Sequence, residues 1–177
     1  MALMGAGALF AEDAYIESDG TQSINTGYYI NAKTKIEIDF QMTEITSQGR
    51  LWGQNGTDCG NMAVVYFGDD ANNFKIGYGN ASFSGAFLAA NNLVRNTIVY
   101  DGPGNKGVLY QNGAQVASCN LTAAHDGTAT FPMSIFGLST NAKGASANGL
   151  VKIKLYGFKV YEDDVPSMTT RRPSGAA

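Results

Sequence analysis

Two carboxylates at alternate positions are the first residues in this chain that could do chemistry. Glu37 and Asp39 lie in a segment that alternates apolar and polar residues. On a strand, this spacing places both side chains on one face, as a retaining glycosidase needs beside its sugar. The further carboxylate of such a strand motif is missing, because Gln41 stands in its place, Met42 points to the opposite face and Glu44 is out of phase. We therefore favour a solvated charged face over a catalytic one.

Trp52, the single tryptophan, is the second candidate. Two-residue periodicity places it on the same strand face as Arg50 and Gln54, opposite Leu51 and Gly53. A flat aromatic ring beside hydrogen-bonding side chains suits a sugar ligand. We expect Arg50, Trp52 and Gln54 to form an outward ligand-binding surface. Packing of Trp52 inside the protein is the alternative.

The remaining polar motifs indicate loops. His125 is the single histidine and no Gly-x-Ser-x-Gly motif accompanies it, so a zinc site or a serine triad would depend on His125 alone. Gly102 to Gly107 lacks the spacing of a phosphate-binding loop. Asp69 and Asp70 form the one acidic loop suited to calcium, although an ordinary Asp/Asn turn explains the same residues.

The two cysteines fit no metal-binding spacing. An even number of cysteines in a secreted protein favours a disulfide. We therefore predict a bridge between Cys59 and Cys119 if the protein is exported, with two unpaired thiols as the alternative.

Composition narrows the class of partner. Of the 177 residues only 15% are charged, and the sole basic cluster is Arg171 and Arg172, which argues against nucleic acid. No segment approaches the roughly 20 apolar residues of a membrane helix. Met1 to Ala11 resembles the apolar part of a secretory signal peptide, with an apolar arm that packs on the domain as the alternative.

Two strands are predicted from periodicity. Thr34 to Thr43 alternates without interruption, which indicates one buried and one solvated face. Gly149 to Asp164 alternates as far as Leu155 and changes phase at Gly157, which predicts one long strand bent by a β-bulge. Val165 to Ala177 has no periodicity and is predicted to be a tail or linker.

Asn112-Gly113 is the best hairpin signal, because both residues accept positive φ. We expect Leu109 or Tyr110, and Val116 on the following strand, to contribute to the core. No stretch carries a helical period for more than a couple of turns. The fold class predicted is all-β: a two-sheet antiparallel sandwich, with the first and last strands in the same sheet.

Three stretches follow one another between Ala14 and Asp164: YIESDGTQSINTGY, VLYQNGAQVAS and FPMSIFGLSTNAKGASANGLVKIKLYGFKVYEDD. Together they resemble the laminin-G-like, concanavalin-A-type jelly-roll domains of bacterial secreted and surface proteins. The resemblance implies a jelly-roll domain over residues 12–164, secretion or surface display, and binding more often than catalysis.

The function predicted is a noncatalytic, secreted or cell-surface module that binds carbohydrate or mediates adhesion. Its expected partners are glycans or surface proteins, and calcium is the one cofactor considered. A structural spacer, or a subunit that self-associates into a surface or filament assembly, is the alternative from another class. A glycoside hydrolase comes third, since the third carboxylate is missing.

Overall fold

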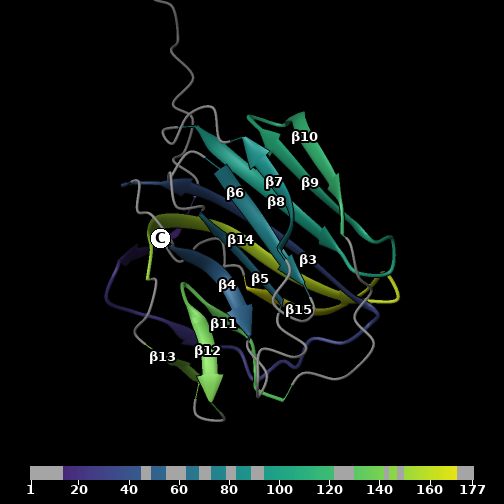
Figure 1. Cartoon of the computed structure of the whole chain (residues 1–177). Helices are drawn as coiled ribbons and strands as arrows, with labels where there is room; N and C mark the ends of the chain where they lie inside the picture. The colour runs from purple at the N-terminus through teal and green to yellow at the C-terminus, as the bar shows by residue number, and fades with distance from the viewer. Residues whose placement is uncertain are drawn as a thin grey trace, which may run out of the picture.

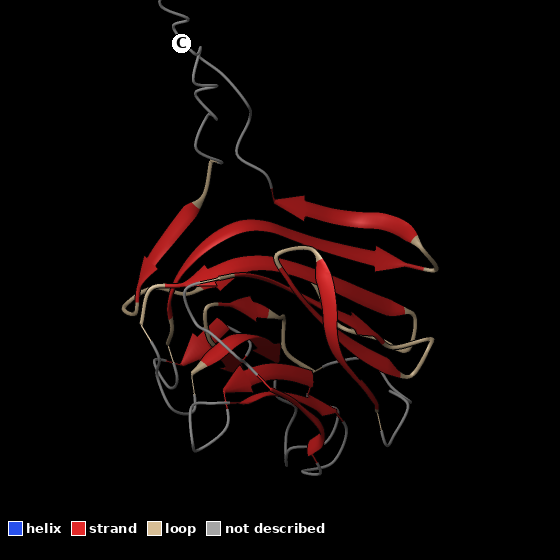
Figure 2. Ribbon diagram, turned by 90° about the horizontal axis from the view of Figure 1, so that it is seen from above, coloured by secondary structure: helices blue, strands red, loops and turns tan. Residues whose placement is uncertain are grey.

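The computed structural model describes residues 14–44, 49–54, 63–67, 73–78, 83–88, 94–121, 130–141, 144–146 and 150–170. These residues form strands and connecting turns, and none of them lies in a helix. The strands make two layers that lie one over the other (Figures 1 and 2). The predicted all-β sandwich is therefore confirmed.

Sheet A has seven strands: β1 (Ile16–Asp19), β3 (Thr34–Met42), β8 (Arg95–Asp101), β9 (Lys106–Gln111), β10 (Ala114–Asn120), β14 (Lys152–Glu162) and β15 (Val165–Thr170). Their order is β1-β14-β3-β8-β9-β10, and β15 also pairs with β14.

Sheet B has eight strands: β2 (Ile24–Asn25), β4 (Arg50–Gln54), β5 (Ala63–Phe67), β6 (Asn73–Tyr78), β7 (Phe83–Leu88), β11 (Ser134–Ile135), β12 (Leu138–Asn141) and β13 (Gly144–Ser146). Their order is β13-β12-β4-β5-β6-β7, and β11 joins β2 to β4.

Strand β14 pairs with both the first and the last strand of the described chain. One edge of β14 pairs with β3, and the other edge pairs first with β1 and then with β15. The predicted bulge is present, because Leu155 pairs with Phe40 and Gly157 with Asp39, which leaves Tyr156 as the extra residue. The first and last parts of the described chain thus meet in sheet A, as predicted (Figure 1).

Alternating residues of β3 contribute one layer of side chains to the core. Ile36, Ile38 and Phe40 are fully buried, while the residues between them are partly exposed. Two edge-to-face aromatic pairs then join the sheets. Phe40 and Phe74 have ring centroids 5.6 Å apart, and those of Trp52 and Tyr100 are 5.5 Å apart.

The hairpin turn at Asn112-Gly113 is confirmed. The two residues have φ of 49° and 80°, and Gln111 pairs with Ala114 across the turn. Leu109 is buried as expected, but Val116 is 50% exposed, so its predicted place in the core is wrong. Val116 is the extra residue of a bulge in β10, which changes the phase of that strand.

The prediction that Val165 begins an aperiodic tail is wrong for its first six residues. Val165–Thr170 forms β15 and pairs with β14 through a turn in which Asp163 and Asp164 have φ of 49° and 62°. This turn lacks the Asn-Gly signature, and a bulge at Ser167 interrupts the alternation. Residues 171–177 lie outside the described part of the chain.

Candidate functional site

The expected outward surface at Trp52 is not formed. Trp52 and Gln54 are completely buried, and only Arg50 of the three is partly exposed. The Trp52 ring packs edge-to-face on Tyr100 of sheet A, across the interior of the sandwich. Trp52 is thus a core residue, the alternative considered for it.

A bulge in β4 explains this difference. Arg50 pairs with Tyr66 and Trp52 with Val65, so Leu51 is an extra residue between them. One extra residue reverses the alternation on its far side. Arg50 and Trp52 are therefore out of phase, although their spacing in the sequence suggests a shared face.

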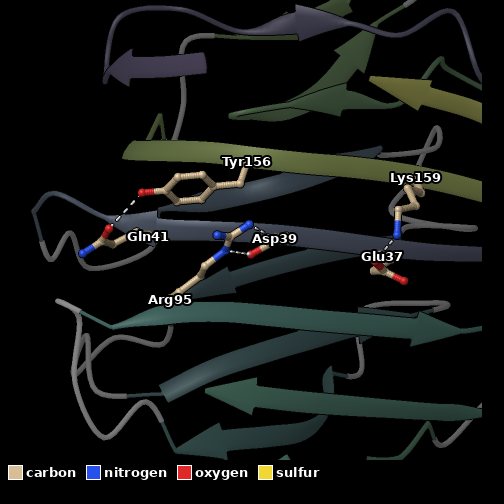
Figure 3. A network of polar contacts seen from close by, with 6 residues as sticks. All are labelled: Glu37, Asp39, Gln41, Arg95, Tyr156 and Lys159. Carbon is tan, nitrogen blue, oxygen red and sulfur yellow. Dashed lines mark hydrogen bonds and ion pairs between the residues drawn. The ribbon is translucent and has the colours of Figure 1, made fainter. Parts of the chain in front are cut away.

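The carboxylate pair, Glu37 and Asp39, lies on the outer face of sheet A as the alternation predicts. Lys159 Nζ lies 2.5 Å from Glu37 Oε1. Arg95 donates from Nε and from an Nη atom to the two oxygens of Asp39, at 2.8 and 2.7 Å. Figure 3 shows both pairs side by side on β14, β3 and β8. These contacts hold each carboxylate against a cation.

Beside the carboxylates, the bulge of β14 presents Tyr156. Its hydroxyl donates to Gln41 Oε1 at 3.0 Å (Figure 3), and the guanidinium carbon of Arg95 lies 4.2 Å from its ring centroid. Tyr15 packs against it edge-to-face at 5.8 Å. We call Tyr15, Tyr156 and Arg95 the tyrosine platform. Lys154 extends this stack, with its Nζ 4.3 Å from the ring centroid of Tyr15.

The tyrosine platform is accessible but held in place. The side chain of Arg95 is 40% exposed and that of Asp39 is 24% exposed, and both tyrosines are partly exposed. Bidentate pairing to a carboxylate and stacking on an aromatic ring both fix the plane of a guanidinium. The arrangement therefore offers a rigid aromatic surface flanked by hydrogen-bonding groups.

Sequence reasoning did not identify the tyrosine platform. Tyr156 directly precedes Gly157, where the change of phase was recognised, and its alternation with the buried Ile153 and Leu155 places it on the outer face. Tyr156 was therefore the signal in the sequence that could have indicated this site. The partnership with Arg95 depends on pairing between distant segments, which the local pattern of β8 does not reveal.

The acidic loop, the histidine and one of the two cysteines discussed in the sequence analysis are not described by the structure. Asp69, Asp70, His125 and Cys59 lie outside the described residues, and the described part of the chain contains no cluster of three or more metal-ligating side chains. Cys119 carries a free thiol, and Cys59 lies outside the described residues, so the bridge between them stays a prediction. Burial raises the pKa of the Cys119 thiol.

A surface pocket of about 500 Å³ lies at one end of sheet A. Its lysines are already paired, with Lys33 Nζ 2.6 Å from Asp163 and Lys35 Nζ 3.2 Å from Asp164, and Asp101 accepts a hydrogen bond from the Gly104 amide at 2.9 Å. The pairs join the start of β3 to the β14–β15 turn. We therefore interpret the residues around this pocket as contacts that hold the turn in place, and we do not assign a ligand to it.

Comparisons with solved structures identify the fold. A mutant of NanB sialidase from Streptococcus pneumoniae matches with a TM-score of 0.59 and 13% identity over 87% of this chain and 26% of that one. The CBM40 module of the Ruminococcus gnavus IT-sialidase matches with a TM-score of 0.52 and 17% identity, over 72% of this chain and 74% of the module. Domains LG4-5 of mouse laminin alpha1 match with a TM-score of 0.50 and 10% identity, over 96% of this chain and 50% of that one.

These similarities confirm the predicted laminin-G-like, concanavalin-A-type jelly roll. The chain spans about a quarter of the sialidase chain, 26% of its length. No protein-family model and no curated protein sequence matches it. The described residues contain no helix long and apolar enough to cross a membrane.

Proposed function

We propose that this protein is a noncatalytic carbohydrate-binding module that binds glycans on the tyrosine platform. The observation that carries this proposal is the partly exposed Tyr156, fixed by the guanidinium of Arg95 over its ring and by edge-to-face contact with Tyr15. A sugar ring has apolar faces and hydroxyl edges, so it suits a flat aromatic surface with polar groups beside it. Gln41 and Asp39 provide these polar groups.

The fold supports the same class of function. One solved structure with this fold is described as a carbohydrate-binding module, and the same module is described bound to alpha2,3 sialyllactose. A fold alone does not determine function, so the platform rather than the fold is the basis of the proposal. We also propose that the protein is secreted or displayed at a cell surface, where glycans occur.

The ion pairs argue for binding without hydrolysis. Glycoside hydrolysis needs one carboxyl group that gives a proton and another that attacks or activates water. Glu37 and Asp39 are each held by a cation, and Gln41 at the next outward position cannot donate a proton to a leaving oxygen. Loss of general acid catalysis alone costs roughly two to four orders of magnitude in rate.

Retention on an immobilised panel of β-glucans, galactans and mucin-type glycans tests this proposal. We expect Tyr156→Ala to lose retention while Tyr29→Ala keeps it. Tyr29 is a matched control, since it is 44% exposed and lies outside the tyrosine platform. New reducing ends that disappear in Glu37→Gln would show that the protein is a hydrolase instead.

A structural spacer is the second candidate, and the burial of Trp52 favours it. Because Trp52 and Gln54 lie in the core, the sugar-binding surface predicted for Arg50, Trp52 and Gln54 does not exist. Retention on no glycan of the panel would make the spacer the better account. Concentration-dependent association in analytical ultracentrifugation would then support a self-associating subunit.

A further inference from the structure

A second outward tyrosine stands on the same cross-strand row as the tyrosine platform. Gly157, which follows Tyr156, pairs with Asp39, Asp39 pairs with Thr97, and Thr97 pairs with Tyr110. Tyr110 is partly exposed, whereas its neighbour Leu109 is fully buried, so Tyr110 faces outward. The row therefore has an aromatic side chain near each end and polar side chains between them.

The length of this row sets the size of a ligand that touches both ends. Tyr156 is on β14 and Tyr110 is on β9, with β3 and β8 between them. Three strand spacings separate the two tyrosines by roughly 14 Å. A hexose unit in an extended chain advances by slightly more than one strand spacing, so a chain of roughly three to four units reaches both tyrosines.

The charged groups at the centre of this face are paired within the protein. Arg95 is engaged by both oxygens of Asp39, and Lys159 is paired with Glu37. An acidic sugar would have to compete for Arg95 with two charge-assisted hydrogen bonds. Neutral hydroxyl groups need no such exchange, because a paired carboxylate still accepts hydrogen bonds and Thr97 offers a hydroxyl of its own.

We infer that the ligand is a neutral, unbranched oligosaccharide of at least three to four units, bound across the strands from Tyr156 to Tyr110. This inference rests on the proposed function, since it describes the ligand of the same face. It adds Tyr110 and Thr97 to the site. It also distinguishes this protein from the module of the same fold that is described with sialyllactose.

Calorimetric titration of the full chain tests the inference. The probes are neutral β-linked glucan, mannan and xylan oligosaccharides of one to six units, with 3′-sialyllactose as the acidic probe. For the neutral series that binds, we expect affinity to rise roughly tenfold from two units to four and then to level off. This affinity should change little between about 50 and about 500 mM salt, because no net charge is neutralised on binding.

Two tyrosine variants sharpen the test. Tyr110→Ala should weaken binding of the four-unit chain by roughly three- to tenfold and leave the two-unit chain unchanged. Tyr161→Ala is the matched control, because Tyr161 is on the outer face of β14 but pairs with Lys35 in a different row. Thermal unfolding checks that each variant is folded, and Tyr110→Trp should tighten binding of the four-unit chain.

The outcomes separate this inference from the proposed function. Affinity that levels off at one or two units, or that Tyr110→Ala leaves unchanged, would overturn the inference while binding through Tyr156 stands. Tighter binding of 3′-sialyllactose than of the neutral chains would also overturn it. No affinity for any probe would overturn both proposals.

Discussion

Two aromatic clusters lie on opposite sides of sheet A and have different uses. Inside the sandwich, Trp52 and Tyr100 pack edge-to-face at 5.5 Å, and both are completely buried. On the outer face, Tyr15 and Tyr156 pack with similar geometry at 5.8 Å but remain partly exposed, with Arg95 over the second ring. The same kind of aromatic contact joins the sheets in one cluster and makes a binding surface in the other.

A β-bulge lies at each of the two clusters. The extra residue in β4 reverses the alternation between Arg50 and Trp52. The extra residue in β14 is Tyr156 itself. In β4 the bulge determined which face received the Trp52 ring, whereas in β14 the alternation that precedes the bulge already places Tyr156 on the outer face.

Substitution of Trp52 should produce the largest effect. We expect Trp52→Ala to lower the free energy of unfolding by about 3–5 kcal/mol, because it leaves a cavity against Tyr100. Tyr156→Ala should lower it by less than about 1 kcal/mol, since a partly exposed ring leaves no closed cavity. Urea denaturation of the two variants measures the difference. Equal losses would mean that the outer cluster is also part of the core.

The sequence predicted those parts of the fold in which alternation is uninterrupted. Strand β3 was predicted correctly because each of its apolar residues packs on one face, and the Asn112-Gly113 turn because its residues accept positive φ. The bulge at Gly157 was predicted because a glycine marks it. The bulge at Leu51 carries no glycine or proline, and the two-residue period therefore failed at Trp52.

The candidate site was predicted only in part, for a related reason. The outward position of Glu37 and Asp39 follows from local alternation. Their cations come from β14 and β8, which are distant in sequence. Such pairing depends on strand order and register, and a single sequence does not specify either.

A substitution in the β9–β10 turn tests the register that separates the two faces. Gly113 has φ of 80°, so Gly113→Val should lower the free energy of unfolding by about 1–2 kcal/mol through backbone strain. No atom lies within 4 Å of the position that a Cβ would take, so a steric clash does not contribute. An unchanged denaturation midpoint would show that this turn does not hold Leu109 inside and Tyr110 outside.

Tyr28 is an intermediate case between the two clusters, because it is partly buried at the end of the sandwich. Its hydroxyl donates to Glu162 at 2.8 Å, and burial is the main cause that raises its pKa to about 12. The unfolded chain loses this proton first, near its ordinary pKa of 10.0. The stabilisation that comes from Tyr28 is therefore complete below pH 10 and is lost as pH rises to about 12.

Comparison with Tyr28→Phe isolates this contribution. The variant should be less stable than the natural protein by about 0.5–1.5 kcal/mol near neutral pH, because the part-buried hydrogen bond to Glu162 is lost. Thermal unfolding at intervals up to pH 12 should show the two stabilities converge. Curves that stay parallel across this range would contradict the raised pKa.

Substitution of Arg95 should have the smallest effect on folding and the most specific effect on the outer cluster. Arg95→Lys keeps the charge but removes the bidentate contact to Asp39 and the flat contact with Tyr156. A partly exposed ion pair is worth roughly 0.2–1 kcal/mol, so the free energy of unfolding should change by less than about 1 kcal/mol. Glycan retention should nevertheless fall, because the ring of Tyr156 is no longer fixed.

Lys35→Ala is the control for Arg95→Lys. It breaks another ion pair of this face, with Asp164, away from the platform. Equal retention in both variants would mean that Arg95 does not position the ring, and that Tyr15 alone distinguishes the outer cluster from an ordinary surface tyrosine.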